Sequence, residues 1–354
     1  MIKFEKKSFS EEDIDDFIDS SKSEYLRTPG MKNSKFIKWK FILNPKGKSN
    51  YFYFKVKDVI AGRILSAHYP GSLVIENFSL SSFCLSDLFI KKEHRQLSHL
   101  KSLYNKCLDE TDGVIFHSSN ENSEKFYTKI LQKKIFFNLI SCGIPLSFKP
   151  FKKYPIFGRL FYLVFIKLFI SHIFFLNKIL KLFKNPNIEY YDNIFFDDDI
   201  RDLRDQNLKN GECFFFKDEN FFKWRYEVYN NIHFLKIFRS KKFIGYISLI
   251  ESEVLDLKNM ILLDFQFTRE LSFLDKIKIK LKIIEISLKR KCDTLYSMGN
   301  QNNYMYKNIL GYPFFKLPDS ILPHSNPMFI HNIPSKHSDK IKNINFTISD
   351  FDYF

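Results

Sequence analysis

Hydrophobic and polar positions follow two periods along residues 86–131. Asp87–Ile90 and Gly113–Phe116 are short apolar runs typical of strands. Between them apolar residues recur at helical spacing, at Leu97, Leu100, Tyr104, Cys107 and Leu108. A further helix follows, with apolar positions at Phe126, Tyr127, Ile130 and Leu131. The stretch therefore predicts strand, turn, helix, strand, turn and helix, in that order.

The preceding part of the chain predicts a helix and a strand pair. Ser10 followed by Glu11, Glu12 and Asp13 is a plausible helix cap with an acidic first turn. Tyr51–Lys55 and Val59–Ala67 then indicate two strands. Strands and helices mixed in this way predict an α/β (α+β) fold.

The pattern of the first half returns in the second. Phe36-Ile37-Lys38-Trp39-Lys40-Phe41 matches Phe221-Phe222-Lys223-Trp224-Arg225-Tyr226, and these contain the only two tryptophans of the chain. Three further stations follow in the same order in both halves: Gly62 and Gly245, Arg95–Leu100 and Arg269–Leu274, and Asn120–Leu131 and Asn300–Leu310. Four matched stations in one order indicate a tandem duplication, in which the tryptophans pack in equivalent core positions.

Phe148–Lys184 separates the two copies and is basic and strongly apolar. Its central part, residues 156–183, has the length of a membrane span. Its polar residues fall within one arc of a helical wheel, however: Arg159, Lys167, Ser171, Asn177, Lys178, Lys181 and Lys184, with His172 outside it. We therefore predict one amphipathic helix that packs between the domains or lies on a membrane surface. The expected division is residues 1–147, a connecting helix at 148–186, and residues 187–354.

Composition and charge narrow the class of protein. The chain has 354 residues, 45% of them hydrophobic, which suffices for two packed cores. A net charge of +15 favours anionic partners such as CoA, nucleotides, nucleic acid or a membrane surface, although diffuse Lys-rich solvation explains it equally well. Five scattered cysteines and an N-terminus without an apolar core predict reduced thiols and a cytoplasmic protein.

The order of these elements resembles the cofactor-binding half of GNAT-type acyltransferases. Their pyrophosphate loop reads R-x-x-G-x-G/A, and Arg95, Ser98 and Leu100 stand at its positions here without the glycines. The W-[KR]-[FY] signature, the duplication and the ending Thr347-Ile348-Ser349-Asp350-Phe351-Asp352 are similar to double-GNAT proteins of bacterial surface-polysaccharide loci. The resemblance implies two tandem GNAT-like domains, each with a mixed, mostly antiparallel sheet and helices on both faces. It also implies transfer of an acyl group from acyl-CoA, acetyl-CoA first of all, to the amine of a nucleotide- or lipid-linked amino sugar.

The turn before the first-half helix is the expected CoA site. Its free backbone amides and the positive end of the helix dipole suit a pyrophosphate, as does a charge-assisted bond from Arg95. A solvated basic turn is the alternative. The candidate cofactor-binding residues are Lys91, Lys92, Arg95, Gln96, Leu97, Ser98, His99 and Leu100, with Asn120 and Ser123 after the next strand. In the second copy Glu270 and Asp275 would repel an anion, so we expect the first copy to bind the cofactor and a degenerate second domain to lie on the acceptor side.

The resemblance points to Tyr127 as the phenol that protonates the leaving thiolate. Candidates for a general base are Asp87 and His117, with Glu76 also near a predicted strand. Asp87 has an echo in Asp264, which indicates a structural role shared by both copies. The histidines show no metal-ligand spacing, so no metal is expected.

Two other functions remain open. A Fem-type aminoacyl transferase has a similar double fold, and a +15 chain could bind its charged tRNA through phosphates. A non-catalytic adaptor could bind a membrane or nucleic acid through its basic surface. Under the preferred interpretation we expect no specific nucleic acid, and contact with the inner face of the membrane through residues 156–183.

Overall fold

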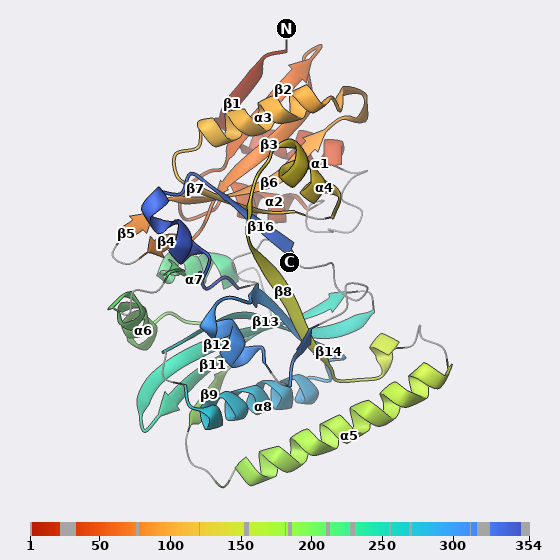
Figure 1. Ribbon diagram of the computed structural model, residues 1–354, viewed down its shortest axis with the longest axis vertical. Helices are drawn as coiled ribbons and strands as arrows, with labels where there is room; N and C mark the ends of the chain where they lie inside the picture. Colours follow the sequence, from red (N-terminus) through yellow and green to blue (C-terminus); the bar gives the residue numbers. More distant parts are fainter. Residues whose placement is uncertain are drawn as a thin grey trace.

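The computed structural model gives the fold of most of the chain. It describes residues 2–21, 33–75, 78–119, 121–151, 156–180, 182, 186–209, 213–226, 231–254, 256–268, 271–311, 313–316 and 326–347. Most of its strands join in one 13-stranded sheet that runs through both halves of the molecule, and a 3-stranded sheet lies beside it (Figure 1). The expected mixed, mostly antiparallel sheet with helices is confirmed.

The first half begins with β1 (Phe4–Ser8), a 3₁₀ turn (Glu11–Asp13), α1 (Ile14–Ser21) and α2 (Ser34–Phe41). Its strands are β2 (Asn50–Val56), β3 (Val59–His68), β4 (Ser72–Ile75), β5 (Phe78–Leu80) and β6 (Ser82–Ile90). A 3₁₀ turn (Lys92–His94), α3 (Leu97–Asp109), β7 (Val114–Ser118), α4 (Glu121–Lys125), a π-helical turn (Phe126–Ile130) and β8 (Ile135–Pro145) follow. This is the predicted order for residues 86–131.

The second half begins after a 3₁₀ turn (Lys149–Phe151) and the long helix α5 (Ile156–Leu180). Its first elements are β9 (Asn187–Tyr191), α6 (Asp198–Lys209), β10 (Cys213–Phe216), α7 (Glu219–Tyr226), β11 (Ile232–Arg239), β12 (Lys242–Val254) and β13 (Leu257–Phe267). The last are α8 (Phe273–Lys289), β14 (Thr294–Asn300), α9 (Tyr304–Ile309), β15 (Phe315–Lys316), β16 (Asn326–His331), a 3₁₀ turn (Ser335–His337) and α10 (Ser338–Ile341).

The strand order of the large sheet is β1-β2-β3-β6-β7-β16-β8-β14-β13-β12-β11-β9, and β15 pairs with β8. Position by position, the order of the first half mirrors that of the second. The two halves exchange strands at the centre: β8 pairs with β14 of the second half, and β16 pairs with β7 of the first. Figure 1 shows β8 running from the upper half into the lower one. Because of this exchange, residues from the end of the chain lie inside the first half.

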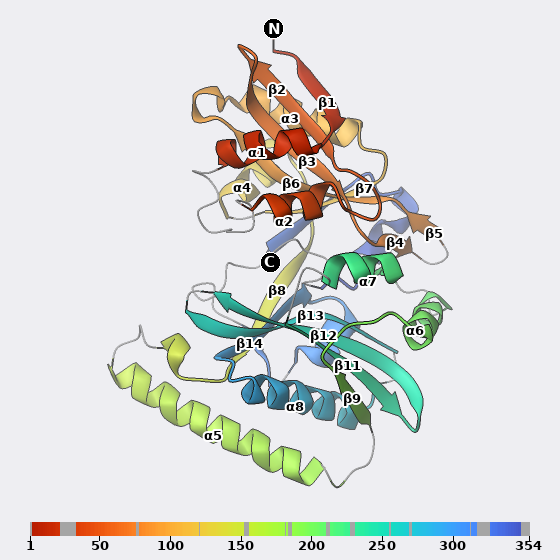
Figure 2. The ribbon, with the colours of Figure 1, turned by 180° about the vertical axis from the view of Figure 1, so that it is seen from behind.

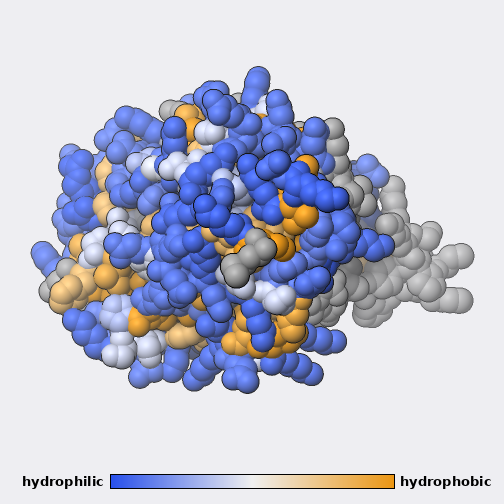
Figure 3. All heavy atoms as spheres, turned by 90° about the horizontal axis from the view of Figure 1, so that it is seen from above, coloured by the Kyte–Doolittle hydropathy of each residue, from blue (hydrophilic) through white to orange (hydrophobic). Residues whose placement is uncertain are grey.

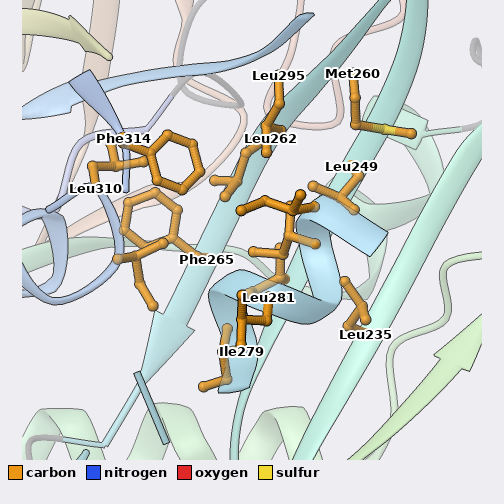
Figure 4. Close-up of a cluster of buried hydrophobic side chains, with 14 of the residues drawn as sticks. Leu235, Leu249, Met260, Leu262, Phe265, Ile279, Leu281, Leu295, Leu310 and Phe314 are labelled. Atoms are coloured by element: carbon orange, nitrogen blue, oxygen red, sulfur yellow. The ribbon is translucent and has the colours of Figure 1, made fainter. Parts of the chain in front are cut away.

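Successive side chains along each strand point to opposite faces of the sheet, so each half has one core on either face. Phe52 and Phe54 of β2 face α3, whereas Tyr51 and Tyr53 face α1 and α2. The second half repeats this arrangement, with α8 on one face of the sheet and α6 and α7 on the other. Figure 4 shows Leu249, Met260 and Leu262 of the sheet against Ile279 and Leu281 of α8.

Gly62 and Gly245, the second pair of matched stations, serve the same purpose in both halves. A Cβ at Gly62 would collide with the ring of Phe54 on the neighbouring strand, and one at Gly245 with the ring of Phe267. Gly245 also has a φ of 158°. Glycine therefore leaves room for an aromatic ring to lie across the backbone at both positions.

Trp39 and Trp224 stack on one another where the two halves meet. Their ring centroids are 4.4 Å apart at an interplanar angle of 13°. Trp39 Nε1 donates to the carbonyl oxygen of Trp224 at 2.8 Å, and Trp224 Nε1 donates to that of Trp39 at 3.1 Å. Both side chains are buried, as expected. The two matched positions form one reciprocal contact between the halves.

α5 lies on the outside of the second half alongside α8 (Figures 1 and 2). Ile166 and Ile173 are buried, and Ile173 belongs to the core beneath α8, against which Phe169, Leu176 and Leu180 also pack. The segment Leu163–Leu180 has a mean hydropathy of 1.8, yet only 11% of it is buried. α5 covers less of the chain than the connecting helix predicted at 148–186, because Lys149–Phe151 form a 3₁₀ turn. One face of α5 packs on the second half.

Candidate active site

β6 and β7 are parallel neighbours that pair over a short length. Their pairing covers Ser82–Cys84 on β6 and Val114–Phe116 on β7. β6 then continues to Ile90 beside β3, where the register shifts and Asp87 takes a φ of 58°. Such a bulge bends the strand. The two strands therefore part at the edge where β6 leads into the basic turn and β7 leads into α4.

The N-terminus of α3 stands at this edge and has an uncapped first turn. Gln96 is the N-cap, its side chain makes no capping hydrogen bond, and the first turn contains no acidic residue. The amides of Gln96 and Leu100 are already bonded, to the carbonyl oxygens of His94 at 2.7 Å and Gln96 at 3.2 Å. The amides of Leu97, Ser98 and His99 belong to the first turn and have no acceptor within the helix. They can bind an anion, which the helix dipole favours.

The N-terminus of the matching helix in the second half, α8, is capped by a carboxylate of the same helix. The Ser272 side chain accepts from the Asp275 amide at 3.2 Å, and the Asp275 carboxylate accepts from the Ser272 amide at 3.0 Å. The same carboxylate pairs with Arg239. A negative charge thus already occupies the N-terminus of α8. Arg269 and Glu270, which entered the prediction for this turn, lie outside the described residues.

The basic side chains of the first-half turn point in different directions. Arg95 is exposed, and its Nε donates to the carbonyl oxygen of Ile90 at 2.9 Å, which holds the side chain across the turn. Lys92 is exposed, whereas Lys91 lines a cavity on the α1 face of the sheet. His99 packs on Phe54, and its Nδ1 lies 3.0 Å from the His94 carbonyl oxygen.

Residues of the turn that carry no charge divide between solvent and core. Gln96, Leu97 and Ser98 are exposed, whereas Leu100 packs against the core under α3. Ser123 is half-buried on α4. Asn120 and Glu76 lie outside the described residues.

Tyr127 and His117 meet in a buried aromatic cluster. Their ring centroids are 4.5 Å apart, and Tyr104 of α3 lies 5.5 Å from the Tyr127 ring. The Tyr104 hydroxyl lies 2.9 Å from His117 Nε2 and 2.8 Å from Nε2 of His331. The two imidazoles stack at 5.2 Å with their Nε2 atoms 3.1 Å apart. Tyr127 itself belongs to the π-helical turn, a distortion often found at functional sites.

Burial sets the protonation states of this cluster. It lowers the pKa of His117 well below its ordinary value, with His331 adding to the effect. Burial, with a contribution from Lys133, lowers the pKa of His331 to about 4. Burial also raises the phenol pKa of Tyr104 and of Tyr127. At neutral pH the imidazoles are therefore uncharged, and the Tyr127 hydroxyl retains its proton.

Sequence reasoning did not find Tyr104 and His331. Tyr104 stood among the periodic apolar positions of its helix, which is typical of a core residue. His331 lies more than two hundred positions from His117 in the sequence. It reaches the cluster because β16 pairs with β7, with Phe329 opposite His117. No local pattern around His331 indicated this pairing.

Asp87 is an ion-paired carboxylate. Its Oδ2 lies 3.6 Å from Lys40 Nζ of α2, and both side chains are 6% exposed. The matched Asp264 accepts from Lys217 at 2.8 Å, from the Tyr246 hydroxyl at 2.8 Å and from Thr347 at 3.0 Å. In both halves a buried lysine thus neutralises the aspartate of the strand before the turn.

The cavity on the α1 face has a volume of about 590 Å³. Its lining contains acids, bases and phenols: Asp13, Asp16, Asp19, Asp58, Lys7, Lys55, Arg63, Lys91, Tyr51 and Tyr53. Burial raises the pKa of Tyr51 to about 12, against the opposing effect of Arg63. The mixture suits a small polar ligand that carries both signs of charge.

Solved structures share this architecture. A GCN5-related N-acetyltransferase from Kribbella flavida superposes with a TM-score of 0.57 at 8% identity, over 93% of this chain and 71% of the other. One from Anabaena variabilis gives 0.56 at 10% identity, over 93% and 72%. This chain has a GNAT-like fold.

The GNAT-like architecture extends to a myristoyl transferase. Saccharomyces cerevisiae N-myristoyltransferase with bound myristoyl-CoA superposes with a TM-score of 0.52 at 10% identity, over 94% of this chain and 79% of the other. At such identities the likeness concerns the fold. Scans against protein-family models and curated proteins gave no match.

Proposed function

We propose that the protein is a CoA-dependent N-acyltransferase that binds acyl-CoA in its first half. The observation that carries the proposal is the difference between two matched helix termini. α3 begins uncapped, without an acid, beside Arg95, whereas the Asp275 carboxylate closes α8. An uncapped helix N-terminus beyond two parting parallel strands suits a pyrophosphate. The GNAT-like fold supports the same assignment.

The mirrored strand order and the reciprocal tryptophan contact support an origin by tandem duplication. In this proposal the first copy, with acyl-CoA on its α3 side, performs the transfer. The second copy keeps the fold and provides β16 to the first. The exchanged strand explains why both copies are needed for one site, since His331 reaches His117 only through β16.

The reaction is a direct attack of an amine on the thioester. The amine nitrogen forms a bond to the carbonyl carbon, the C–S bond breaks, and the amine loses one proton to a base. Tyr127 then protonates the departing thiolate, because burial keeps its hydroxyl protonated at neutral pH. The neutral ring of His117 packs on the Tyr127 ring and holds it in place, and solvent returns the proton to Tyr127 after CoA leaves.

The acceptor is an amino sugar, nucleotide- or lipid-linked, which belongs to surface-polysaccharide synthesis at the cytoplasmic side of the membrane. The cavity on the α1 face supports this class. Asp16 and Asp19 can bind the ammonium form of the acceptor before it loses its proton, and Lys55 and Lys91 can bind a phosphate.

Titration calorimetry with acetyl-CoA tests the cofactor site. Arg95→Ala is expected to lower the affinity roughly tenfold to a hundredfold, because charge-assisted bonds contribute about 1.5–3 kcal/mol each. Arg201→Ala is the matched control, since Arg201 is an exposed arginine of α6 paired with Asp198. Equal losses for both variants, or no binding by the unmodified protein, would contradict the proposal.

Steady-state kinetics with an amino-sugar acceptor test the role of Tyr127. Tyr127→Phe keeps the ring that packs on His117 and removes the hydroxyl. We expect kcat to fall by roughly a hundredfold while the affinity for acetyl-CoA stays unchanged. An unchanged kcat would remove Tyr127 from the mechanism.

A further inference from the structure

α5 has two hydrophobic faces, and the structure uses one of them. Ile166 and Ile173 are buried, and Phe169, Leu176 and Leu180 pack beside them on the second half. These positions are three or four residues apart and form one face. A second set with helical spacing is exposed: Leu168 by 66%, Phe175 by 62%, Val164 by 54% and Ile179 by 40%. The second set forms what we call the outer stripe.

The charges beside the outer stripe are of one sign. Lys167 and Lys178 are exposed and lie three turns apart on its flank. Residues 125–188 contain no Asp and no Glu, although they include this helix and both of its approaches. Cations along the border of an exposed apolar face are typical of helices that lie in the surface of an anionic bilayer.

The sheet excludes a transmembrane orientation of α5. The helix leaves β8 and leads into β9, and both strands belong to the same sheet. A helix of 25 residues is about 37 Å long and would place its ends on opposite sides of a bilayer. Spanning would also require Ile173 to leave the core of the second half, together with Phe169 and Leu176, which pack against it. A membrane that contacts α5 would therefore have to lie parallel to the helix axis.

A second copy of the chain fits the outer stripe less well. Two copies joined face to face would bring Lys167 and Lys178 of each close to those of the other. No acidic residue of the same region could neutralise them. The opposite end of the molecule, formed by the first half, presents a mostly hydrophilic surface with separate hydrophobic patches (Figure 3). The orientation of the protein on a membrane would therefore be set by α5, at the end formed by the second half.

We propose that α5 docks the protein on an anionic lipid surface, with Val164, Leu168, Phe175 and Ile179 inserted among the acyl chains. Lys167 and Lys178 then lie at the level of the lipid phosphates. The first half, with the cavity and the turn before α3, extends away from the membrane. This docking concerns a surface far from the proposed transfer site and does not depend on the reaction.

Flotation with lipid vesicles tests the docking without acyl-CoA or acceptor. The unmodified protein is expected to float with phosphatidylglycerol–phosphatidylcholine vesicles and to float less with phosphatidylcholine alone. Leu168→Asn combined with Phe175→Asn should lower the partition coefficient roughly a hundredfold or more, because both side chains lose their transfer into lipid. Lys167→Gln and Lys178→Gln should each lower it about fivefold, on the anionic vesicles alone.

A matched control distinguishes docking through α5 from non-specific hydrophobic adsorption to the vesicles. Leu43→Asn combined with Phe78→Asn removes one Leu and one Phe, 55% and 50% exposed, from the first half, and should leave flotation unchanged. The proposal is overturned if the α5 double variant floats like the unmodified protein, or if both double variants lose flotation equally. It is also overturned if the unmodified protein forms dimers in buffer and the α5 double variant is monomeric. Extraction from cell membranes by detergent and not by alkali would instead show a span.

Discussion

Ser98→Asp separates ligand binding from folding because it should change the two in opposite directions. Ser98 is exposed in the first turn of α3, which contains no acidic residue. An acid there interacts favourably with the helix dipole and contributes about 0.3–1 kcal/mol to stability. The protein should therefore become slightly more stable.

The same carboxylate should weaken acyl-CoA binding. It would stand beside the amides of Leu97 and His99, where the pyrophosphate is proposed to bind. Two unit charges about 4 Å apart repel by roughly 1–4 kcal/mol at the dielectric constants of a protein surface. The affinity for acetyl-CoA should fall roughly tenfold to a hundredfold. The Asp275 carboxylate occupies the start of α8 in a similar way.

The assay combines calorimetric titration with acetyl-CoA and chemical denaturation of the free protein. Ser98→Asn is the control, since it has the size of Asp without the charge. Both measurements are repeated at low and high salt. Because salt screens the repulsion between the introduced carboxylate and the pyrophosphate, the loss of affinity should be smaller at high salt. The reasoning is refuted if Ser98→Asp and Ser98→Asn bind acetyl-CoA equally well, or if the acid destabilises the protein.

Two further predictions concern the junction of the halves. Trp39→Phe leaves the Trp224 carbonyl oxygen without its buried donor and loses part of the ring stack, so chemical denaturation should show a loss of about 2–4 kcal/mol; a loss below 1 kcal/mol would contradict it. Because the pKa of His331 is about 4 when folded and near 6.5 when unfolded, the unfolded chain binds its proton first as the pH falls. The contribution of His331, on the order of 3 kcal/mol, should be full above pH 6.5 and lost by about pH 4. A His331→Gln variant should show a flatter dependence, and an equal slope would argue against this assignment.

The elements of the first half could be predicted where their signals come from residues close together in the sequence. The order of elements over residues 86–131 follows from a change between the strand and helix periods, which depends on neighbouring residues. The lack of an acid at the start of α3 and the acid at the start of α8 are also local, because a cap involves residues three positions apart. Both helix termini could therefore be predicted from their residues.

The candidate site depends on contacts that no local pattern reveals. Asp87 is a candidate base by its place in the sequence, and its pairing with Lys40 is set by the packing of α2 on the sheet. The spacing of Tyr104 along its helix predicts a core position, and its hydroxyl acquires partners only where β7 and β16 meet. The wheel of α5 separated polar from apolar residues, but which apolar face packs on the second half was decided by α8.

Local sequence patterns predicted the order of elements over residues 86–131, the matched positions of the two halves and the difference between the starts of α3 and α8. These features arise from periodicity, capping and turn chemistry within a few residues. Three other features depend on the packing of the whole chain: β8 and β16 exchange partners, Trp39 stacks on Trp224, and His331 lies beside His117. Strand pairing is made by backbone hydrogen bonds that are the same for nearly every residue, so the partner of a strand depends on the whole fold.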